Sequence, residues 1–324
     1  MKRREFLINS IAGASGLLLG SALSCTEVKP GSKNAVAKAA TFDPWEIVQL
    51  GRTPVKVTRV GFGTGFMGGH NSSNQVRLGK ETFEKLLRQT YDRGCRLFDC
   101  ADAYGSHPYI IPALKGIPRE NYTIVSKIAV WNLPDEEIDK PAVIVDRFLK
   151  ELDTDYIDLL LLHYMVPPDW NITLRPYMDG LSEIKAKGKV RALGVSCHSL
   201  EALQTAAEEP WVESVHARIN AFGVEMDGSP EEVVPVLRKI HDAGKGVIGM
   251  KLIGNGTFRN SRELREKSAD FVLNLGCVNA VVVGFESLDN VTDYEDIVRK
   301  TIRKIGVTGL EPATFPKGHS NQTA

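Results

Sequence analysis

The sequence predicts an α/β protein whose body is one (β/α)₈ barrel, a TIM barrel, flanked by additional segments. Short apolar runs alternate with longer amphipathic runs from about residue 57 to residue 305. Eight such pairs in roughly 250 residues match the size and count of this barrel. The run 156–163 is almost uninterruptedly apolar, and such a strand needs helices over both faces of a parallel sheet.

The first half of the pattern contains four strand–helix pairs. The predicted strands are 57–62, 96–101, 123–129 and 156–163, and the predicted helices are 81–93, 110–115, 142–152 and 178–186. The segment 81–93 is predicted to be a helix because Phe83, Leu86 and Leu87 would share one face and Gly94 is a typical C-terminal cap.

The second half repeats the scheme. The predicted strands are 190–196, 214–220, 246–252 and 280–285, and the predicted helices are 200–208, 231–243, 262–275 and 290–305. A doubly wound open sheet is the rival architecture, but it needs Gly-x-Gly-x-x-Gly directly after its first strand. The stretch 61–65 is glycine-rich without that spacing, and the barrel is therefore favoured.

The chain ends differ from this body. We expect a signal peptide over 1–25, a linker over 26–46, the barrel over 47–305 and a disordered tail over 306–324. Arg3-Arg4 stands directly before an apolar run, which is typical of a twin-arginine export signal. The expected location is therefore the bacterial periplasm or cell envelope, with the twin-arginine export machinery as a partner.

The end of the predicted signal peptide allows two outcomes. Small residues precede Cys25, so cleavage there would leave this cysteine at the new N-terminus. The surrounding residues also loosely resemble a bacterial lipoprotein box, in which that cysteine carries a lipid anchor. Plain cleavage and lipidation of Cys25 both remain open.

Composition excludes some partners. Lys+Arg and Asp+Glu number 40 each, so the molecule as a whole does not attract nucleic acid, and we expect none as a ligand. The cysteines form no Cys-x-x-Cys motif and no Cys/His spacing typical of zinc. We therefore expect no metal site, and buried free thiols in the barrel.

Ionisable residues follow three successive strands at their carboxyl ends, where barrels of this kind carry their chemistry. They are Asp99, Tyr104, Lys127 and His163. A lysine close to a tyrosine favours the phenolate, a carboxylate keeps the lysine charged, and an imidazole can orient a carbonyl oxygen. Each residue alone has a plain structural explanation, but together they predict an active site that needs a cofactor as hydride source.

Several motifs in this order resemble one family. The segments 98–105, 124–127, 155–163 and 188–196 are similar to signatures of the aldo/keto reductases, and the resemblance runs from about residue 57 to 291. It implies that Tyr104 donates the proton, Lys127 and Asp99 tune it, and His163 positions a small-molecule carbonyl substrate. It also implies NADP or NAD as the cofactor.

By the same resemblance, residues at the strand ends would contact the cofactor. These are Gly63, Thr64, Ser196, Cys197, Asn220, Met250, Lys251 and Gly284. Three of the departures from the family pattern bear on the cofactor. Cys197 replaces a usual asparagine, Arg218 lies where a glutamine is common, and Glu286 stands where users of NADPH often carry a basic residue. The carboxylate of Glu286 would repel a 2′-phosphate, which hints at NAD(H).

Two classes of function remain in competition. The first is an NAD(P)-dependent oxidoreductase. The second is a cofactor-binding regulatory or binding subunit of the same fold without turnover. A cofactor-free hydrolase or isomerase would need paired carboxylates or a metal set at the barrel mouth, and the sequence contains neither pattern.

Overall fold

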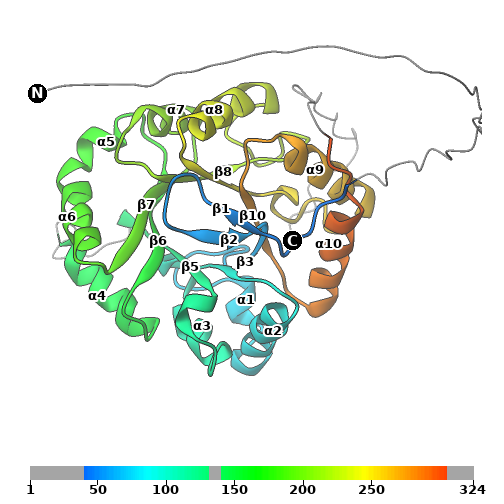
Figure 1. The fold of residues 1–324 in the computed structure, drawn as a ribbon, viewed down its shortest axis with the longest axis horizontal. Helices are drawn as coiled ribbons and strands as arrows, with labels where there is room; N and C mark the ends of the chain where they lie inside the picture. Colours follow the sequence, from blue (N-terminus) through cyan, green and yellow to red (C-terminus); the bar gives the residue numbers. More distant parts are fainter. Residues whose placement is uncertain (1–39, 131–139, 305–324) are drawn as a thin grey trace, which may run out of the picture. The chain divides into compact units, whose positions relative to one another are not determined.

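The computed structural model describes residues 40–130 and 140–304 (Figure 1). The predicted signal peptide 1–25, most of the predicted linker and the predicted tail 306–324 lie outside these described residues, as does Cys25. In the part that is described, no helix combines the length and apolarity needed to cross a membrane.

Eight parallel strands close into a barrel in the order β10-β3-β4-β5-β6-β7-β8-β9, so the predicted (β/α)₈ fold is confirmed (Figure 1). The strands are β3 (Val60–Gly63), β4 (Leu97–Asp99), β5 (Thr123–Ile128), β6 (Ile157–Met165), β7 (Val190–Cys197), β8 (Ser214–Arg218), β9 (Gly246–Met250) and β10 (Ala280–Gly284).

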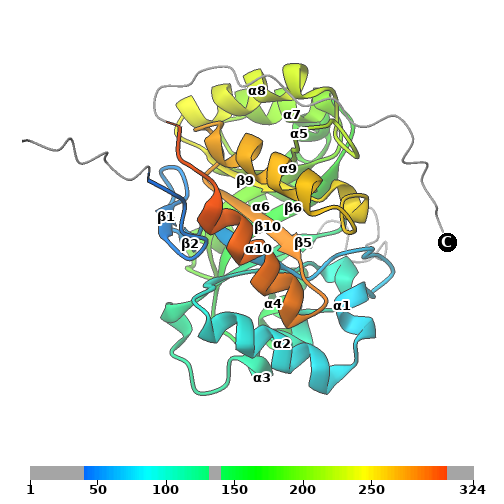
Figure 2. The same cartoon turned by 90° about the vertical axis from the view of Figure 1, so that its right-hand side faces the viewer.

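Helices cover the outside of this barrel. They are α1 (Asn74–Arg77), α2 (Lys80–Asp92), α3 (His107–Ala113), α4 (Pro141–Glu151), α5 (Trp170–Thr173), α6 (Arg175–Ala186), α7 (Leu200–Glu208), α8 (Pro230–Asp242), α9 (Arg262–Asn274) and α10 (Leu288–Lys300), with 3₁₀ turns η1 (Asp102–Tyr104), η2 (Arg119–Asn121) and η4 (Gly254–Gly256). Side chains of Ser199, Ser261 and Ser287 accept backbone N–H groups and so begin α7, α9 and α10. Figure 2 shows α9 and α10 side by side on the outer face, next to β10.

Successive side chains of each strand point alternately into the barrel and toward the helices, which divides the buried residues into two layers. The inner layer fills the barrel and includes Leu97, Val125, Leu159, Leu161, Ala192 and Ile248. The outer layer lies between the strands and the helices. Along a strand, every second side chain faces the same way. Two residues after Leu97, Val125 and Leu161 of this inner layer, the side chains of β4, β5 and β6 therefore face inward again. Asp99, Lys127 and His163 therefore point into the mouth of the barrel rather than toward the helices.

The beginning of the barrel differs from the prediction. The expected strand 57–62 is two strands, because the chain turns between β2 (Lys56–Thr58) and β3. β2 pairs antiparallel with β1 (Ile47–Gln49), which the sequence analysis missed. Leu50 and Val55 of this hairpin join the inner layer, so the hairpin closes the end of the barrel opposite the mouth (Figures 1 and 2).

The fold also begins earlier than expected. Thr41 pairs with Ile302, and the ring of Phe42 is 7% exposed within the outer layer. The guanidinium carbons of Arg59 and Arg303 lie 5.3 and 4.4 Å from the centre of that ring. The last residues of the predicted linker 26–46 thus pack on the barrel, and α10 ends at Lys300 rather than near 305.

Candidate active site

The four predicted active-site residues meet at the mouth of the barrel. The Lys127 Nζ atom lies 2.6 Å from Asp99 Oδ1 and 5.0 Å from the centre of the Tyr104 ring. The Tyr104 hydroxyl lies 3.3 Å from Nε2 of His163. β4, β5 and β6 are adjacent in the barrel, and this adjacency brings the side chains together.

Lys127 and Asp99 form a buried ion pair. The Lys127 side chain is only 1% exposed, and its Nζ also donates to the carbonyl of Cys100 at 2.8 Å. Burial disfavours both charges, but the lysine overcomes this for Asp99 and, together with His216, lowers its pKa to about 2. Burial likewise lowers the pKa of Lys127, and Asp99 more than compensates, so that pKa is raised. Both groups are therefore charged at neutral pH.

Tyr104 and His163 are both neutral at neutral pH. Burial raises the pKa of Tyr104, while Lys127 opposes this rise. Burial and the positive charge of Lys127 hold the pKa of His163 well below its usual value. The site thus presents a protonated phenol beside an uncharged imidazole. This arrangement suits donation of a proton to a substrate oxygen and orientation of that oxygen by a neutral hydrogen bond.

Two glycines allow Tyr104 to reach this place. A Cβ atom at Gly65 would collide with the Tyr104 ring, so the bare backbone leaves room for it. Gly105 follows the tyrosine with φ 65°, and a Cβ atom there would collide with the carbonyl of Asn71. The left-handed conformation and the close backbone contact both require glycine.

A chain of ion pairs and hydrogen bonds supports the site from behind. Both guanidinium Nη atoms of Arg147 donate to Asp102 at 2.9 Å, and Nη1 also donates to Glu151. Glu151 lies 2.7 Å from Nδ1 of His107, whose Nε2 lies 2.8 Å from the hydroxyl of Ser126. The chain connects the turn that carries Tyr104 to the residue next to Lys127, so it fixes the two relative to each other.

His107 is positively charged within this series of ion pairs and hydrogen bonds. Its ring is 2% exposed, and burial alone would lower its pKa. The sulfur of Cys100 and the carboxylate of Glu151 outweigh burial and raise the pKa to about 9. The pKa of Glu151 is lowered, since His107 and Arg147 outweigh the effect of burial on the carboxylate. We therefore treat the His107–Glu151 contact as an ion pair at neutral pH.

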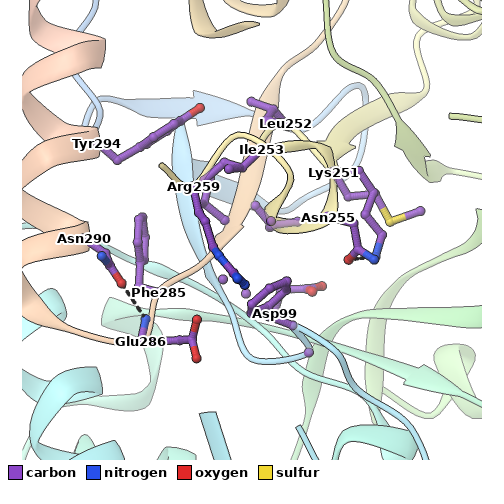
Figure 3. Close-up of a pocket in the computed structure, with 18 of the residues that line it drawn as sticks. Asp99, Lys251, Leu252, Ile253, Asn255, Arg259, Phe285, Glu286, Asn290 and Tyr294 are labelled. Atoms are coloured by element: carbon purple, nitrogen blue, oxygen red, sulfur yellow. Dashed lines mark hydrogen bonds between the residues drawn. The ribbon is translucent and has the colours of Figure 1, made fainter. Parts of the chain in front are cut away.

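A groove of about 520 Å³ leads from these residues to the molecular surface (Figure 3). Asp99, Tyr104 and Lys127 line its inner end, and the ends of β9 and β10 with the following loops line its walls. Gly284 presents bare backbone there, since a Cβ atom would lie 2.8 Å from Cβ of Phe66. A groove of this volume, with bare glycine backbone in its lining, fits a dinucleotide whose ring must approach the reacting atoms closely.

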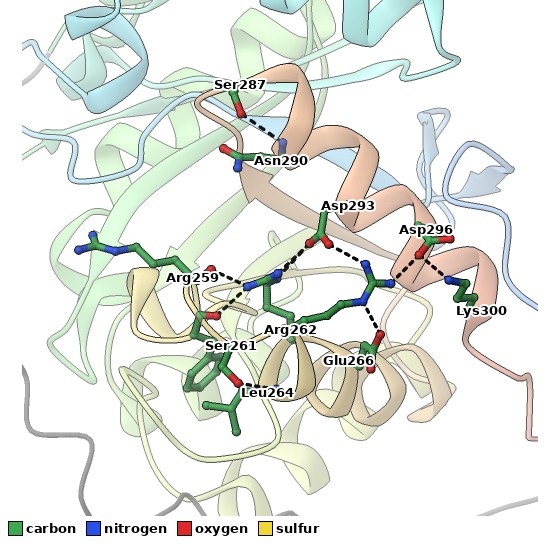
Figure 4. A network of polar contacts seen from close by, with 12 residues as sticks. Arg259, Ser261, Arg262, Leu264, Glu266, Ser287, Asn290, Asp293, Asp296 and Lys300 are labelled. Carbon is green, nitrogen blue, oxygen red and sulfur yellow. Dashed lines mark hydrogen bonds and ion pairs between the residues drawn. The ribbon is translucent and has the colours of Figure 1, made fainter.

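A network of ion pairs connects α9 and α10, and its members Arg265 and Asp293 line the groove. Asp293 accepts from Arg262 and Arg265, and Asp296 accepts from Arg262 and Lys300 (Figure 4). Across 40–130 and 140–304, the Arg259 guanidinium has no hydrogen bond or ion pair, and it points into the groove (Figure 3). A free cation of this kind suits an anionic group such as a diphosphate.

The structure places half of the predicted cofactor residues on this groove. Gly63, Met250, Lys251 and Gly284 line it. Nζ of Lys251 donates to Asn255 at 2.8 Å (Figure 3), and burial lowers the pKa of this lysine.

The other four do not line the groove. The hydroxyl of Thr64 donates to the carbonyl of Asp99, and the hydroxyl of Ser196 accepts the backbone N–H of Tyr164. The side-chain amide of Asn220 is fully used within the protein. Its Nδ2 donates to the carbonyls of Val224 and Lys251, and its Oδ1 accepts two backbone N–H groups.

Cys197 needs a correction. Its side chain is completely buried in the outer layer, between the barrel and the helices. Because neighbouring residues of a strand face opposite sides, Cys197 cannot share the inward face with Ser196. Its position argues against the predicted contact with the cofactor. The described cysteines, Cys95, Cys100, Cys197 and Cys277, are all buried and unpaired, and the described residues include no group of three or more His, Cys, Asp or Glu suited to a metal.

The sequence analysis missed one residue of the site. His216, on β8, lies in the barrel interior, and its Nε2 is 3.0 Å from Asp99 Oδ1. Arg218, two residues later on the same face, instead donates to Asp227 and to the carbonyl of His198. His216 and Arg218 both lie on the inward face of β8, so the alternation of side chains along the strand would have identified both as candidates. Only the packing shows that His216 is the one that reaches Asp99.

Comparisons with known proteins agree on one family. A model of the aldo/keto reductase family matches residues 59–304. The chain is 28% identical over 221 residues to "Probable aldo-keto reductase 1" of Glycine max, covering 65% of this chain and 60% of that protein. It is 27% identical over 199 residues to aldo-keto reductase YhdN of Bacillus subtilis, covering 59% of this chain and 57% of that protein.

The matched region thus spans about three-fifths of the length of these curated relatives. Among solved structures, the holo form of aldo-keto reductase AKR11C1 from Bacillus halodurans is similar, with a TM-score of 0.64. That match covers 80% of this chain and 93% of the other at 21% identity, so it concerns the fold.

The charged His107 makes the stability of the protein depend on pH. Its folded pKa of about 9 exceeds the ordinary value of 6.5, so the ion pair contributes fully below pH 6.5 and is lost as pH rises through about 9. We expect the stability advantage of the native chain over His107→Gln to shrink by about 3 kcal/mol from pH 6.5 to 9.5. Urea unfolding at a series of pH values measures this difference.

His241→Gln, at a more exposed histidine of α8, is the control for removal of an imidazole. A stability difference between native chain and His107→Gln that stays constant over the whole range would mean that His107 is neutral.

Proposed function

Because the chain belongs to the aldo/keto reductase family, we propose that it is an NAD(P)-dependent oxidoreductase that interconverts a small-molecule carbonyl compound and its alcohol. The observation that carries this proposal is the assembly of Tyr104, His163, Lys127 and Asp99 at the inner end of the groove. A binding protein without turnover has no need of a phenol, an imidazole and a buried ion pair in hydrogen-bond contact.

The chain's own residues would handle the proton. Tyr104 holds it on a hydroxyl directed toward His163, and donates it to the oxygen of the substrate as negative charge develops there. Lys127 stabilises the phenolate that remains, and Asp99 keeps the lysine charged and in position. The neutral imidazole of His163 orients the same oxygen.

The groove residues would hold the cofactor. A bound nicotinamide dinucleotide supplies the hydride that no side chain carries. Gly63 and Gly284 leave room for it beside the tyrosine, and Lys251 and Arg259 provide positive charge along the walls. The loop after β9 and the start of α10 enclose the outer part of the groove (Figure 3).

Tyr104→Phe tests the catalytic proposal. Consumption of NADH and NADPH with a panel of aldehydes, ketones and sugars should fall by about 10²- to 10⁴-fold, which is the usual contribution of a positioned general acid. Cofactor affinity, measured by quenching of protein fluorescence, should change little because the ring of residue 104 remains. Tyr91→Phe, at a tyrosine of α2 that stacks on Arg96, is the matched control.

One result would sink the catalytic proposal. A native chain that binds the dinucleotide tightly but converts no carbonyl in the panel would favour the cofactor-binding regulatory subunit instead.

We propose NAD(H) as the preferred cofactor. Glu286 lines the outer groove, where its carboxylate accepts from the Asn74 amide at 2.9 Å, and Asp289 lines the groove within the first turn of α10. Carboxylates at this end repel a 2′-phosphate and can accept hydrogen bonds from ribose hydroxyls. Arg259, on the opposite wall, is the residue that would favour the phosphate.

Direct binding distinguishes these two influences. We expect NADH to bind at least about tenfold more tightly than NADPH, and Glu286→Lys to reduce or reverse that ratio by exchanging repulsion for attraction. Isothermal titration with each dinucleotide gives the dissociation constants. Glu263→Gln, at an exposed glutamate of α9, is the control. Tighter binding of NADPH, lost in Arg259→Gln, would refute the preference for NAD(H).

We also propose that the protein is exported through the twin-arginine pathway to the periplasm or cell envelope. Arg3-Arg4 before the apolar run supports this proposal, and Cys25 is the candidate for a lipid anchor.

Cell fractionation with intact mass measurement tests the export proposal. We expect the envelope fraction to contain a chain that begins at Cys25, with added mass if that cysteine carries lipid. Replacing Arg3 and Arg4 by lysine preserves the charge and should retain the uncleaved chain in the cytosol. An uncleaved native chain found only in the cytosol would refute export.

A further inference from the structure

His216 contacts the catalytic ion pair from the far side of the barrel. Its ring is completely buried, and Nε2 lies 3.0 Å from Oδ1 of Asp99. The same oxygen accepts from Nζ of Lys127 at 2.6 Å. β8, which carries the histidine, is not a neighbour of β4 or β5 in the barrel, so this contact crosses the interior.

The protonation state of His216 follows from its surroundings. Burial lowers its pKa, and the negative charge of Asp99 only partly offsets this effect. A neutral imidazole has one N–H group, and a carboxylate only accepts, so the hydrogen atom sits on Nε2 and points at Asp99. The described charged groups that act on the ring are Asp99 and Lys127, which oppose each other.

The second ring nitrogen of His216, Nδ1, makes the placement of this histidine energetically unfavourable. Within residues 40–130 and 140–304, Nδ1 of His216 is buried without a hydrogen-bond partner. An unmatched buried acceptor is unfavourable in a folded protein, and an apolar side chain would avoid this penalty. The favourable contact of the residue is the hydrogen bond to Asp99. This balance points to a role for that bond at the site.

We propose that His216 is a positioning residue of the proton-donating site: its Nε2–H holds the Asp99 carboxylate in place and takes up part of its negative charge. This inference rests on the proposed function. An acceptor that is shared between two donors neutralises Lys127 less completely than one that faces the lysine alone. More of the positive field of Lys127 then acts on Tyr104, where it stabilises the phenolate left after proton transfer.

Two variants of similar size separate the hydrogen bond from the packing. His216→Gln can bring an amide N–H close to the place of the imidazole Nε2–H, whereas His216→Met fills the space without a donor. We expect kcat of carbonyl reduction to fall roughly 10- to 100-fold in His216→Met, the effect of a lost hydrogen bond to a charged group. His216→Gln should recover most of that loss.

Two further readouts report on the role itself. The solvent deuterium isotope effect on kcat should increase in His216→Met, because proton donation by Tyr104 becomes slower. The dissociation constant of the nicotinamide dinucleotide, measured by direct titration, should change less than about threefold in both variants, well below the loss of kcat.

Three results would overturn the proposal. Equal loss of kcat in both variants would mean that the packing of residue 216 matters and the donor does not. Unchanged kcat in His216→Met would mean that the hydrogen bond has no role. Dinucleotide binding that weakens as strongly as kcat falls would make His216 a cofactor contact.

A measurement without substrate separates this inference from the proposed function. Nitrogen-15 NMR of the histidine rings should show His216 as a neutral Nε2–H tautomer, and its Nε2–H signal should shift in Asp99→Ala. An Nδ1–H tautomer, or no response to Asp99→Ala, would refute the contact itself. A native chain that shows this signal but reduces no carbonyl would refute the proposed function while leaving the contact established.

Discussion

The buried Lys127–Asp99 ion pair is the constraint on which the rest of the site depends. A single unpaired charge inside the barrel would be strongly destabilising, so each member requires the other. The pair fixes the ends of β4 and β5 relative to each other. Lys127 also donates a hydrogen bond to the carbonyl of Cys100, and Asp99 also accepts one from the ring of His216. The ring of Tyr104, the proton donor of the proposed mechanism, then lies with its centre 5.0 Å from the lysine Nζ.

Support for this pair comes from opposite directions. The inner layer of aliphatic residues and the β1–β2 hairpin fill the barrel below it, so water has little access from that side. The polar chain from Asp102 through Arg147, Glu151 and His107 to Ser126 lies behind it. Gly65 and Gly105 let the tyrosine turn fit between the two. Rigidity around the proposed proton donor matters because small displacements of reacting groups reduce a rate steeply.

Periodicity alone predicted the barrel and the convergence of Asp99, Lys127 and His163, because all three continue the inward face of apolar strands. It could not place His216, because this residue reaches Asp99 by a contact across the interior between strands that are far apart in sequence. The Cys197 prediction ignored strand parity, which places adjacent residues on opposite faces. A single residue, Arg59, separates β2 from β3, and so short an interruption leaves no mark on the periodicity of 57–62, so the hairpin was missed.

The segment around Phe42 has a practical consequence. It packs against the end of α10, at the end of the barrel closed by the hairpin, whereas the groove opens at the other end. A surface coupling or fusion partner attached just before Thr41 would therefore leave the barrel at its closed end. An immobilised preparation built in this way would present its groove to the solution, with the support behind it.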